Sequence, residues 1–314
     1  EARWALARLD TPAGHAPFAA RLDPPYGVFY AGWSNWLRGG VLKLQSPAQR
    51  DPREIARFEI ECAALAAAFD RSATPFLAAY PGQAWPVDST VAVAALRLHD
   101  SLLQPRFTST IDRWLAAAQQ RLDPATGLLP HRADFRTGRM LESARGSSQS
   151  IIARFLIEID PAWGRAQYRQ FRTKFVAAPF SVPGVREYPQ GINGAGDVDS
   201  GPLIFGLSTS ATAVMLGAAQ LHNDRAFADP VRHVAEATGM PVGWGSSKRY
   251  LFGALPVADA FVVWAKTARP WIAQPAPEAW PAVVPWWWRW PFHALTLAPA
   301  ALLWLPFVRK PRRT

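Results

Sequence analysis

The sequence predicts an all-α protein, an (α/α)6-type toroid of helical hairpins that is followed by a C-terminal transmembrane helix. Three observations indicate this class. Segments of about 14 to 18 residues repeat their apolar side chains at helical spacing, strand-like alternation is almost absent, and long loops rich in Gly and Pro lie at alternate joints. Such pairing favours concentric hairpins over a four-helix bundle. A ring that is incomplete at its N-terminus is compatible with the pattern, and a solenoid is the weaker alternative because no repeat of fixed length is visible.

The composition excludes several classes of protein. A chain of 314 residues with 49% hydrophobic residues has room for one or two domains and a large core. The single cysteine, Cys62, excludes a disulfide framework, a four-cysteine zinc site and an iron–sulfur cluster within this chain. The six histidines lack paired-ligand spacing, and nucleotide-binding and serine-hydrolase motifs are missing. We therefore expect neither a metal nor a cofactor.

Eight helices are predicted from the apolar spacing and from residues that favour helix ends. The first has Asp51 as N-cap and Pro52 in its first turn, and the second follows a cap at Asp88-Ser89-Thr90. A turn at 123–127 ends the third. In order, the helices cover residues 52–69, 88–103, 109–118, 147–159, 161–176, 208–221, 225–238 and 256–267.

Three long loops, 78–87, 128–146 and 178–206, fall at alternate joints of the predicted hairpins. In a toroid such loops meet at one end of the ring. Long loops inside a compact domain are usually functional, so a pocket is expected at that end.

The loop 184–202 is the most site-like segment of the sequence. It contains Glu187, Tyr188, Asp197 and Asp199 among five glycines. Glycines let the backbone approach a ligand, and carboxylates serve as general acid, general base or oxygen ligands. An equally weighted alternative is that Asp197 and Asp199 only bind loop amides. A calcium site is a smaller possibility, because no further acids follow at the required spacing.

Three further segments offer candidate residues. Gln83, Trp85 and Asp88 lie just before a helix, where an apolar environment would raise the pKa of Asp88, although its simpler role is an N-cap. Tyr30, Trp33 and Asn35, expected ahead of another helix, would line a pocket or stack on sugars, but such aromatics are more often core. The third loop is basic around His131, and it either meets an anionic group or is simply solvated. Its charged members are Arg132, Asp134, Arg136, Arg139 and Arg145.

The net charge is concentrated near the C-terminus. The chain carries 34 basic and 24 acidic residues, a formal charge of +10. From Arg269 onward there are six basic residues and one acidic residue, which is half of the excess. A general nucleic-acid-binding surface is therefore disfavoured, and no nucleic acid is expected as partner.

The last 46 residues predict a membrane anchor. Residues 1–268 form the toroid domain, 269–285 a Pro-rich linker, 286–308 a transmembrane helix and 309–314 a basic cytoplasmic tail. Tryptophans at both ends of the apolar run and four basic residues after it place the C-terminus in the cytoplasm and the body on the outer face. The alternative is a buried or peripheral apolar tail. Because the chain starts at Glu1, a signal peptide or an upstream portion is expected to have been removed.

These segments, taken in order, resemble the linalool dehydratase/isomerase family between about Tyr30 and Lys266. Family-like motifs recur in the same order. They are Tyr30-Ala-Gly-Trp-Ser-Asn35, Tyr80-Pro81 through Asp88, Asp123-Pro124-x-x-Gly127, Asp160-Pro161-Ala162, Arg186-Glu187, Asp197-x-Asp199-x-Gly201 and Ser247-Lys-Arg-Tyr250. The resemblance implies an (α/α)6 toroid and cofactor-independent dehydration and isomerisation of a monoterpene alcohol.

The sequence departs from this family at the chemistry. Trp33 stands where the family has its catalytic histidine, and Ala79 and Asp88 stand where it has two cysteines. Linalool activity is therefore not expected. The ionisable Asp88 nevertheless keeps a proton-transferring group at one of the three positions.

Two functions follow from these observations. The first is a membrane-anchored, cofactor-independent lyase or hydrolase that acts on an isoprenoid alcohol or an envelope glycan, with Asp88 and either Glu187 or Asp199 as acid/base pair. The second is a non-catalytic envelope protein that binds a glycan or a lipid, and a homo-oligomer is left open in both. The expected substrate-binding residues are Tyr30, Trp33, Gln83, Trp85, Tyr188 and Asp197. Convergence of the carboxylates on one site would favour the enzyme.

Overall fold

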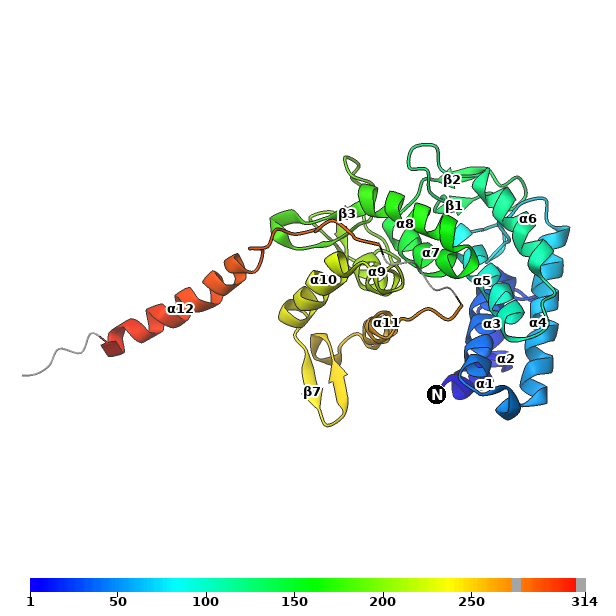
Figure 1. Cartoon of the computed structure of the whole chain (residues 1–314), viewed down its shortest axis with the longest axis horizontal. Helices are drawn as coiled ribbons and strands as arrows, with labels where there is room; N and C mark the ends of the chain where they lie inside the picture. Colours follow the sequence, from blue (N-terminus) through cyan, green and yellow to red (C-terminus); the bar gives the residue numbers. More distant parts are fainter. Residues whose placement is uncertain (273–277, 309–314) are drawn as a thin grey trace, which may run out of the picture.

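The computed structural model describes residues 1–272 and 278–308, and this part of the chain is mostly helical with a few short strands (Figure 1). Its α-helices are α1 (Ala2–Leu9), α2 (Pro12–His15), α3 (Gly27–Lys43), α4 (Pro52–Arg71), α5 (Pro86–Leu102), α6 (Thr108–Gln119), α7 (Gly146–Ile159), α8 (Pro161–Phe175), α9 (Thr209–Leu221), α10 (Arg225–Thr238), α11 (Pro256–Lys266) and α12 (Trp290–Val308). Three short 3-10 helices are η1 (Pro47–Gln49), η2 (Pro179–Ser181) and η3 (Leu251–Gly253).

The eight helices predicted from apolar spacing are confirmed as α4 to α11. The predicted cap of α4 is also confirmed, since the Asp51 carboxylate accepts the Arg53 N–H at 2.8 Å. Three helices before α4 were not predicted. Helix α3 contains the segment from Tyr30 to Trp36, which was expected to lie ahead of a helix. The helix was missed because its glycines and aromatic residues hide the usual apolar spacing.

The helices between α3 and α11 form an inner and an outer row. Alternate helices contact one another in sequence, with α3 against α5, α5 against α7, α7 against α9, and α9 against α11. Helices α4, α6, α8 and α10 each pack outside this inner row. In Figure 1 the rows follow an open arc that leads from α1–α4 at one end to α10 and α11 at the other.

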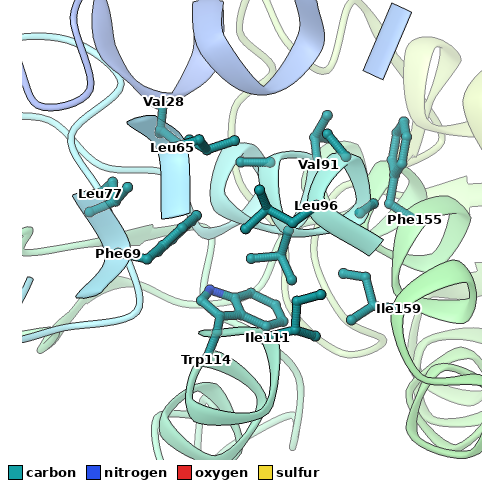
Figure 2. Packing of buried hydrophobic residues seen from close by; sticks show 14 of the residues in the cluster. Val28, Leu65, Phe69, Leu77, Val91, Leu96, Ile111, Trp114, Phe155 and Ile159 are labelled. Carbon is teal, nitrogen blue, oxygen red and sulfur yellow. The ribbon is translucent and has the colours of Figure 1, made fainter. Parts of the chain in front are cut away.

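Helix α5 lies at the centre of the larger core (Figure 2). Its residues Val91 to Leu96 are completely buried, and they contact α3 closely because Gly32 has no side chain: a Cβ there would lie 3.0 Å from the Ala92 backbone. A second core surrounds Phe171, Met215 and Phe227 of α8, α9 and α10. Packing in these cores therefore holds α5 and the helices around it in place.

Short strands lie in the loops between the helices. They are β1 (Arg132–Ala133), β2 (Met140–Glu142), β3 (Val176–Ala177), β4 (Gly184–Arg186), β5 (Leu203–Ile204), β6 (Leu207–Ser208), β7 (Val242–Trp244) and β8 (Ser247–Arg249). Strands β3, β4, β6 and β5 form one antiparallel sheet in that order, with Val185 opposite Ser208. This sheet supports the two ends of the loop 187–202.

The segment after α11 lies against the body instead of extending from it. We call its described parts, residues 269–272 and 278–289, the strap. Trp271 stacks on Trp36 of α3 with ring centroids 4.5 Å apart, and the Trp280 indole N–H donates to the His222 carbonyl at 3.0 Å. The predicted linker 269–285 is thus packed where it is described, and its residues 273–277 lie outside the described part.

Helix α12 follows the strap and projects away from the body (Figure 1). In residues 1–272 and 278–308, none of the helices combines the length and the apolar content that a bilayer crossing requires, so the transmembrane helix predicted at 286–308 is not found. The predicted cytoplasmic tail, residues 309–314, lies outside the described part of the chain.

Candidate functional site

Asp88 lies in the first turn of α5 and does not cap that helix. The N-cap is Trp85, the helix begins at Pro86, and no side chain caps it, so the predicted cap at Asp88 is wrong. Two factors explain this: Pro86 begins a helix readily, and the following residues are all buried. Only 6% of Asp88 is exposed, and within the described chain its carboxyl group has no partner in hydrogen-bond geometry.

The surroundings of Asp88 keep its carboxyl group protonated at neutral pH. Burial raises the pKa of Asp88 to about 8. The nearby Trp33 indole N–H opposes the rise in pKa, whereas the negative charge of Asp199 adds to it. That N–H stays outside hydrogen-bond geometry, so its effect is weaker than that of a true hydrogen bond. A carboxyl group with such a pKa can donate a proton at pH 7.

Asp199 reaches the same place from the loop after β4. Its carboxylate has neither a hydrogen bond nor an ion pair with any other residue of the described chain, and the residue is exposed. Burial of part of the group and the neighbouring Asp197 raise the pKa of Asp199, and Arg145 lowers it. The pKa of Tyr80 rises through burial and then through the charges of Asp88 and Asp199. The structure therefore brings Asp88, Asp199 and Tyr80 together.

Asp197 orders the loop that carries Asp199. Its Oδ1 accepts the backbone N–H groups of Asp199 and Ser200, each at 3.0 Å, and its Oδ2 lies 2.7 Å from Nη2 of Arg145. Although burial opposes it, the Ser200 N–H and Arg145 lower the pKa of Asp197. The alternative in which the two aspartates bind loop amides thus applies to Asp197, which also pairs with Arg145, and does not apply to Asp199.

Glu187 is fully engaged at the start of α7. Its Oε1 accepts from Nε of Arg145 and from the Ser147 hydroxyl, both at 2.7 Å, and its Oε2 accepts the Ser147 N–H at 3.1 Å. Burial raises the pKa of Glu187, while Ser147 and Arg145 oppose that rise. These contacts satisfy the free amide end of α7 and close a buried ion pair.

The remaining predicted binding residues are divided between the site and its surroundings. Trp33 packs edge-on against Phe155 and Trp85 packs edge-on against Tyr80, so both adjoin the site. Tyr188 lies under the Arg145 guanidinium, 5.4 Å from its ring centroid. The Gln83 side chain is exposed at a turn.

Tyr30 points away from the site. Its hydroxyl group is within 2.8 Å of His15 Nε2 and donates to Asp10 Oδ1 at 3.2 Å. Burial and Asp10 raise the pKa of Tyr30. This part of the predicted pocket therefore belongs to a separate N-terminal contact.

Three members of the site were not chosen from the sequence: Tyr80, His131 and Arg145. His131 is 5% exposed and bonds Ser148 Oγ at 2.6 Å, so it is not solvated. Burial, then Arg145, lowers the pKa of His131 to about 4, which keeps the imidazole neutral. Tyr80, His131 and Arg145 lie in loops that were expected to meet, and this was the signal in the sequence that could have pointed to them. Spacing along the sequence does not show which side chains are buried.

Family models and curated proteins do not assign this site. No family model matches the chain, and no curated protein matches it. Within the described residues no group of three or more His, Cys, Asp or Glu side chains is placed to hold a metal ion. Two surface hollows, of about 370 and 400 Å³, lie elsewhere, beside Arg225 and beside Asp70.

Proposed function

We propose that the chain is an acid–base enzyme in which Asp88 donates a proton and Asp199 accepts one. The observation that carries this proposal is a pair of neighbouring carboxyl groups: Asp88, buried with a pKa of about 8, and Asp199, which has no hydrogen-bond or ion-pair partner in the described chain. Two neighbouring carboxyl groups in different surroundings, one buried and one exposed, can take opposite roles in one reaction.

The chemistry that fits is cleavage of a carbon–oxygen bond. The protonated Asp88 would donate its proton to a leaving oxygen, and the ionised Asp199 would remove a proton from the adjacent carbon or from water. The first outcome is elimination from an isoprenoid alcohol and the second is hydrolysis of an envelope glycan. Aromatic side chains of Trp33, Tyr80 and Trp85 adjoin the pair and suit either substrate, because they cover apolar chains and stack on sugar rings.

We also propose that the arc is part of an (α/α)6 toroid of the linalool dehydratase/isomerase type. The inner and outer rows and the order of family-like motifs support this proposal. In such a fold the starts of α5 and α7 lie at one end of the ring, which is where Asp88 and Glu187 are found.

We also propose that α12 attaches the body to the outer face of a membrane. Its apolar side chains are exposed all round, among them Leu295, Leu303 and Trp304. Tryptophans lie at its start, and four basic residues follow in the sequence. Flotation with liposomes should be lost when residues 286–314 are deleted, and persistence of flotation would disprove the attachment.

The decisive experiment identifies what the protein binds and whether Asp88 acts on it. Mass spectrometry of small molecules retained by the purified chain, followed by assays with isoprenoid alcohols and envelope-glycan fragments, should reveal a converted substrate. The D88N variant should lose conversion, whereas D112N, at an exposed carboxylate of α6, should retain it. A ligand that is retained but never converted, and that binds D88N equally well, would favour the non-catalytic alternative.

A further inference from the structure

Five aromatic side chains lie in contact with one another between the strap and Asp88. Trp271 of the strap stacks on Trp36 of α3, with an angle of 5° between the ring planes. Trp36 packs edge-on against Phe155 of α7 at 5.0 Å, and Phe155 packs edge-on against Trp33 of α3 at 5.3 Å. Trp264 of α11 contacts both Phe155 and Trp33, each at 6.3 Å between ring centroids. We call these five residues the aromatic cluster.

The end of the cluster next to Asp88 is an indole N–H that makes no hydrogen bond. The Nε1 atom of Trp33 is buried and has no hydrogen-bond partner in the described chain, although the Asp88 carboxyl group is nearby. A buried tryptophan usually pairs its N–H, because an unpaired buried donor is costly. Packing against Phe155 and Trp264 therefore holds this indole in a position that its own hydrogen bonding does not favour.

The other end of the cluster is a close-fitting seat for Trp271. A Cβ on Gly40 would lie 2.5 Å from the Trp271 ring, so the absence of a side chain at this position leaves room for the indole. The Glu158 carboxylate accepts the backbone N–H of Trp271, which fixes the strap at the same place. Trp271 thus closes the cluster and supports Trp36 from the side of the strap.

We propose that Trp271 is a positioning residue for Asp88: through the aromatic cluster it holds Trp33 where the indole N–H does not complete a hydrogen bond with the Asp88 carboxyl group. This inference rests on the proposed function, in which Asp88 must keep its proton until a leaving oxygen takes it. A donor aimed at a carboxylate favours the ionised form, so a Trp33 side chain that turned toward Asp88 would lower the pKa of Asp88. The strap therefore acts on the site from the far end of the cluster.

The test is the carboxyl ¹³C NMR titration of Asp88 in the full chain, kept in a mild detergent that covers α12. The signal that is missing in D88N assigns the resonance. Trp271→Ala should lower the pKa of Asp88 by about one unit, because the freed Trp33 N–H then donates to the carboxylate. Trp271→Phe keeps a stacking ring and should restore most of the wild-type value. Trp280→Ala is the matched control, since this strap tryptophan packs on Tyr168 of the second core, and it should leave the titration unchanged.

A double-mutant comparison separates positioning from a general loosening of the core. Water that enters a loosened core would also lower the pKa of Asp88. Trp271→Ala is therefore repeated in a Trp33→Phe background, where the indole N–H is missing and the substitution should no longer move the titration. Asp199 and Tyr80, which also titrate near Asp88, are the same in every variant. An equal fall in both backgrounds, or no fall in either, would overturn the inference.

A second variant keeps the test available if Trp271→Ala does not fold. Gly40→Ala displaces the same indole without removing a ring, and it then takes the place of Trp271→Ala in both backgrounds.

The result is separate from the fate of the proposed function. The inference is judged by the difference between variants, whereas the function is judged by the wild-type titration and by conversion of a substrate. A fall that is confined to proteins containing Trp33 supports the positioning role even if wild-type Asp88 titrates near about pH 4, a value that would remove it as the proton donor.

Discussion

Two groups of carboxylates meet at the starts of α5 and α7, and they differ in their partners. Glu187 uses both oxygens for Arg145 and Ser147. Asp88 is also buried but has no partner in hydrogen-bond geometry within the described chain, and the charge that acts on its pKa is that of another acid, Asp199. Burial alone therefore does not determine the role of a carboxylate. Partnered groups stabilise the loops, and unpartnered ones carry a free-energy cost, for which the proposed proton transfer gives a reason.

The largest effect is expected for Glu187→Gln. This change removes the charge that compensates buried Arg145, and breaking a buried ion pair costs about 3–5 kcal/mol. Urea unfolding should show this loss, while D112N should match the wild type. A loss below about 1 kcal/mol would mean that Asp197 alone compensates Arg145.

The second effect is the contribution of Asp88 to the pH dependence of stability. An acid paired with a base makes a protein more stable as pH rises, whereas Asp88 should do the opposite. Folded Asp88 keeps its proton up to about pH 8, whereas the unfolded chain releases it near pH 4. The unfolded state therefore binds fewer protons between these values, so this group makes the protein less stable as pH rises, by up to about 1.4 kcal/mol per unit.

Unfolding curves at about pH 7 and 8 measure this contribution, because His131 and His222, whose pKa values burial lowers to about 4 and 3, have largely stopped titrating there. The wild type should lose stability relative to D88N over this interval. Parallel pH profiles of the two proteins would show that Asp88 has an ordinary pKa.

A smaller effect is expected for Asp197→Asn. Asparagine keeps an oxygen for the Asp199 and Ser200 N–H groups but gives up the charge that pairs with Arg145. Since the Asp197 side chain is 43% exposed, the loss should be about 1 kcal/mol or less. Asp197→Ala removes both contacts and should also speed hydrogen exchange at Ser200. Equal exchange in the two variants would contradict the role of Oδ1.

The smallest change in stability, within about 0.5 kcal/mol, is expected for Asp199→Asn, because this carboxylate has no partner in the described chain to lose. The pKa of Asp88 should fall, since the neighbouring negative charge disappears. Carboxyl ¹³C NMR titration of Asp88 measures this shift. An unchanged pKa would separate the two groups and remove Asp199 from the proposed pair.

The helical class and eight helix positions could be predicted because local spacing and caps determine them, as Asp51 and Pro52 show for α4. Helix α3 could not, because its fit depends on Gly32 and Gly39 allowing α5 to approach, which is a property of the packed pair. At the site, the sequence indicated Asp88 and Asp199 as acids. It assigned Asp199 to the acid/base pair and Asp197 to binding, but it could not show that Arg145, from another loop, pairs with Asp197.

The strap has a practical consequence for anyone dividing this chain into fragments. A fragment that ends at the predicted domain boundary, residue 268, would discard the Trp271 and Ile272 amides that the Glu158 carboxylate accepts at 2.9 Å. It would also uncover Tyr168 and His222 where Trp280 rests. The shortest piece expected to behave like the intact body therefore ends near residue 289, well after the last helix of the inner row.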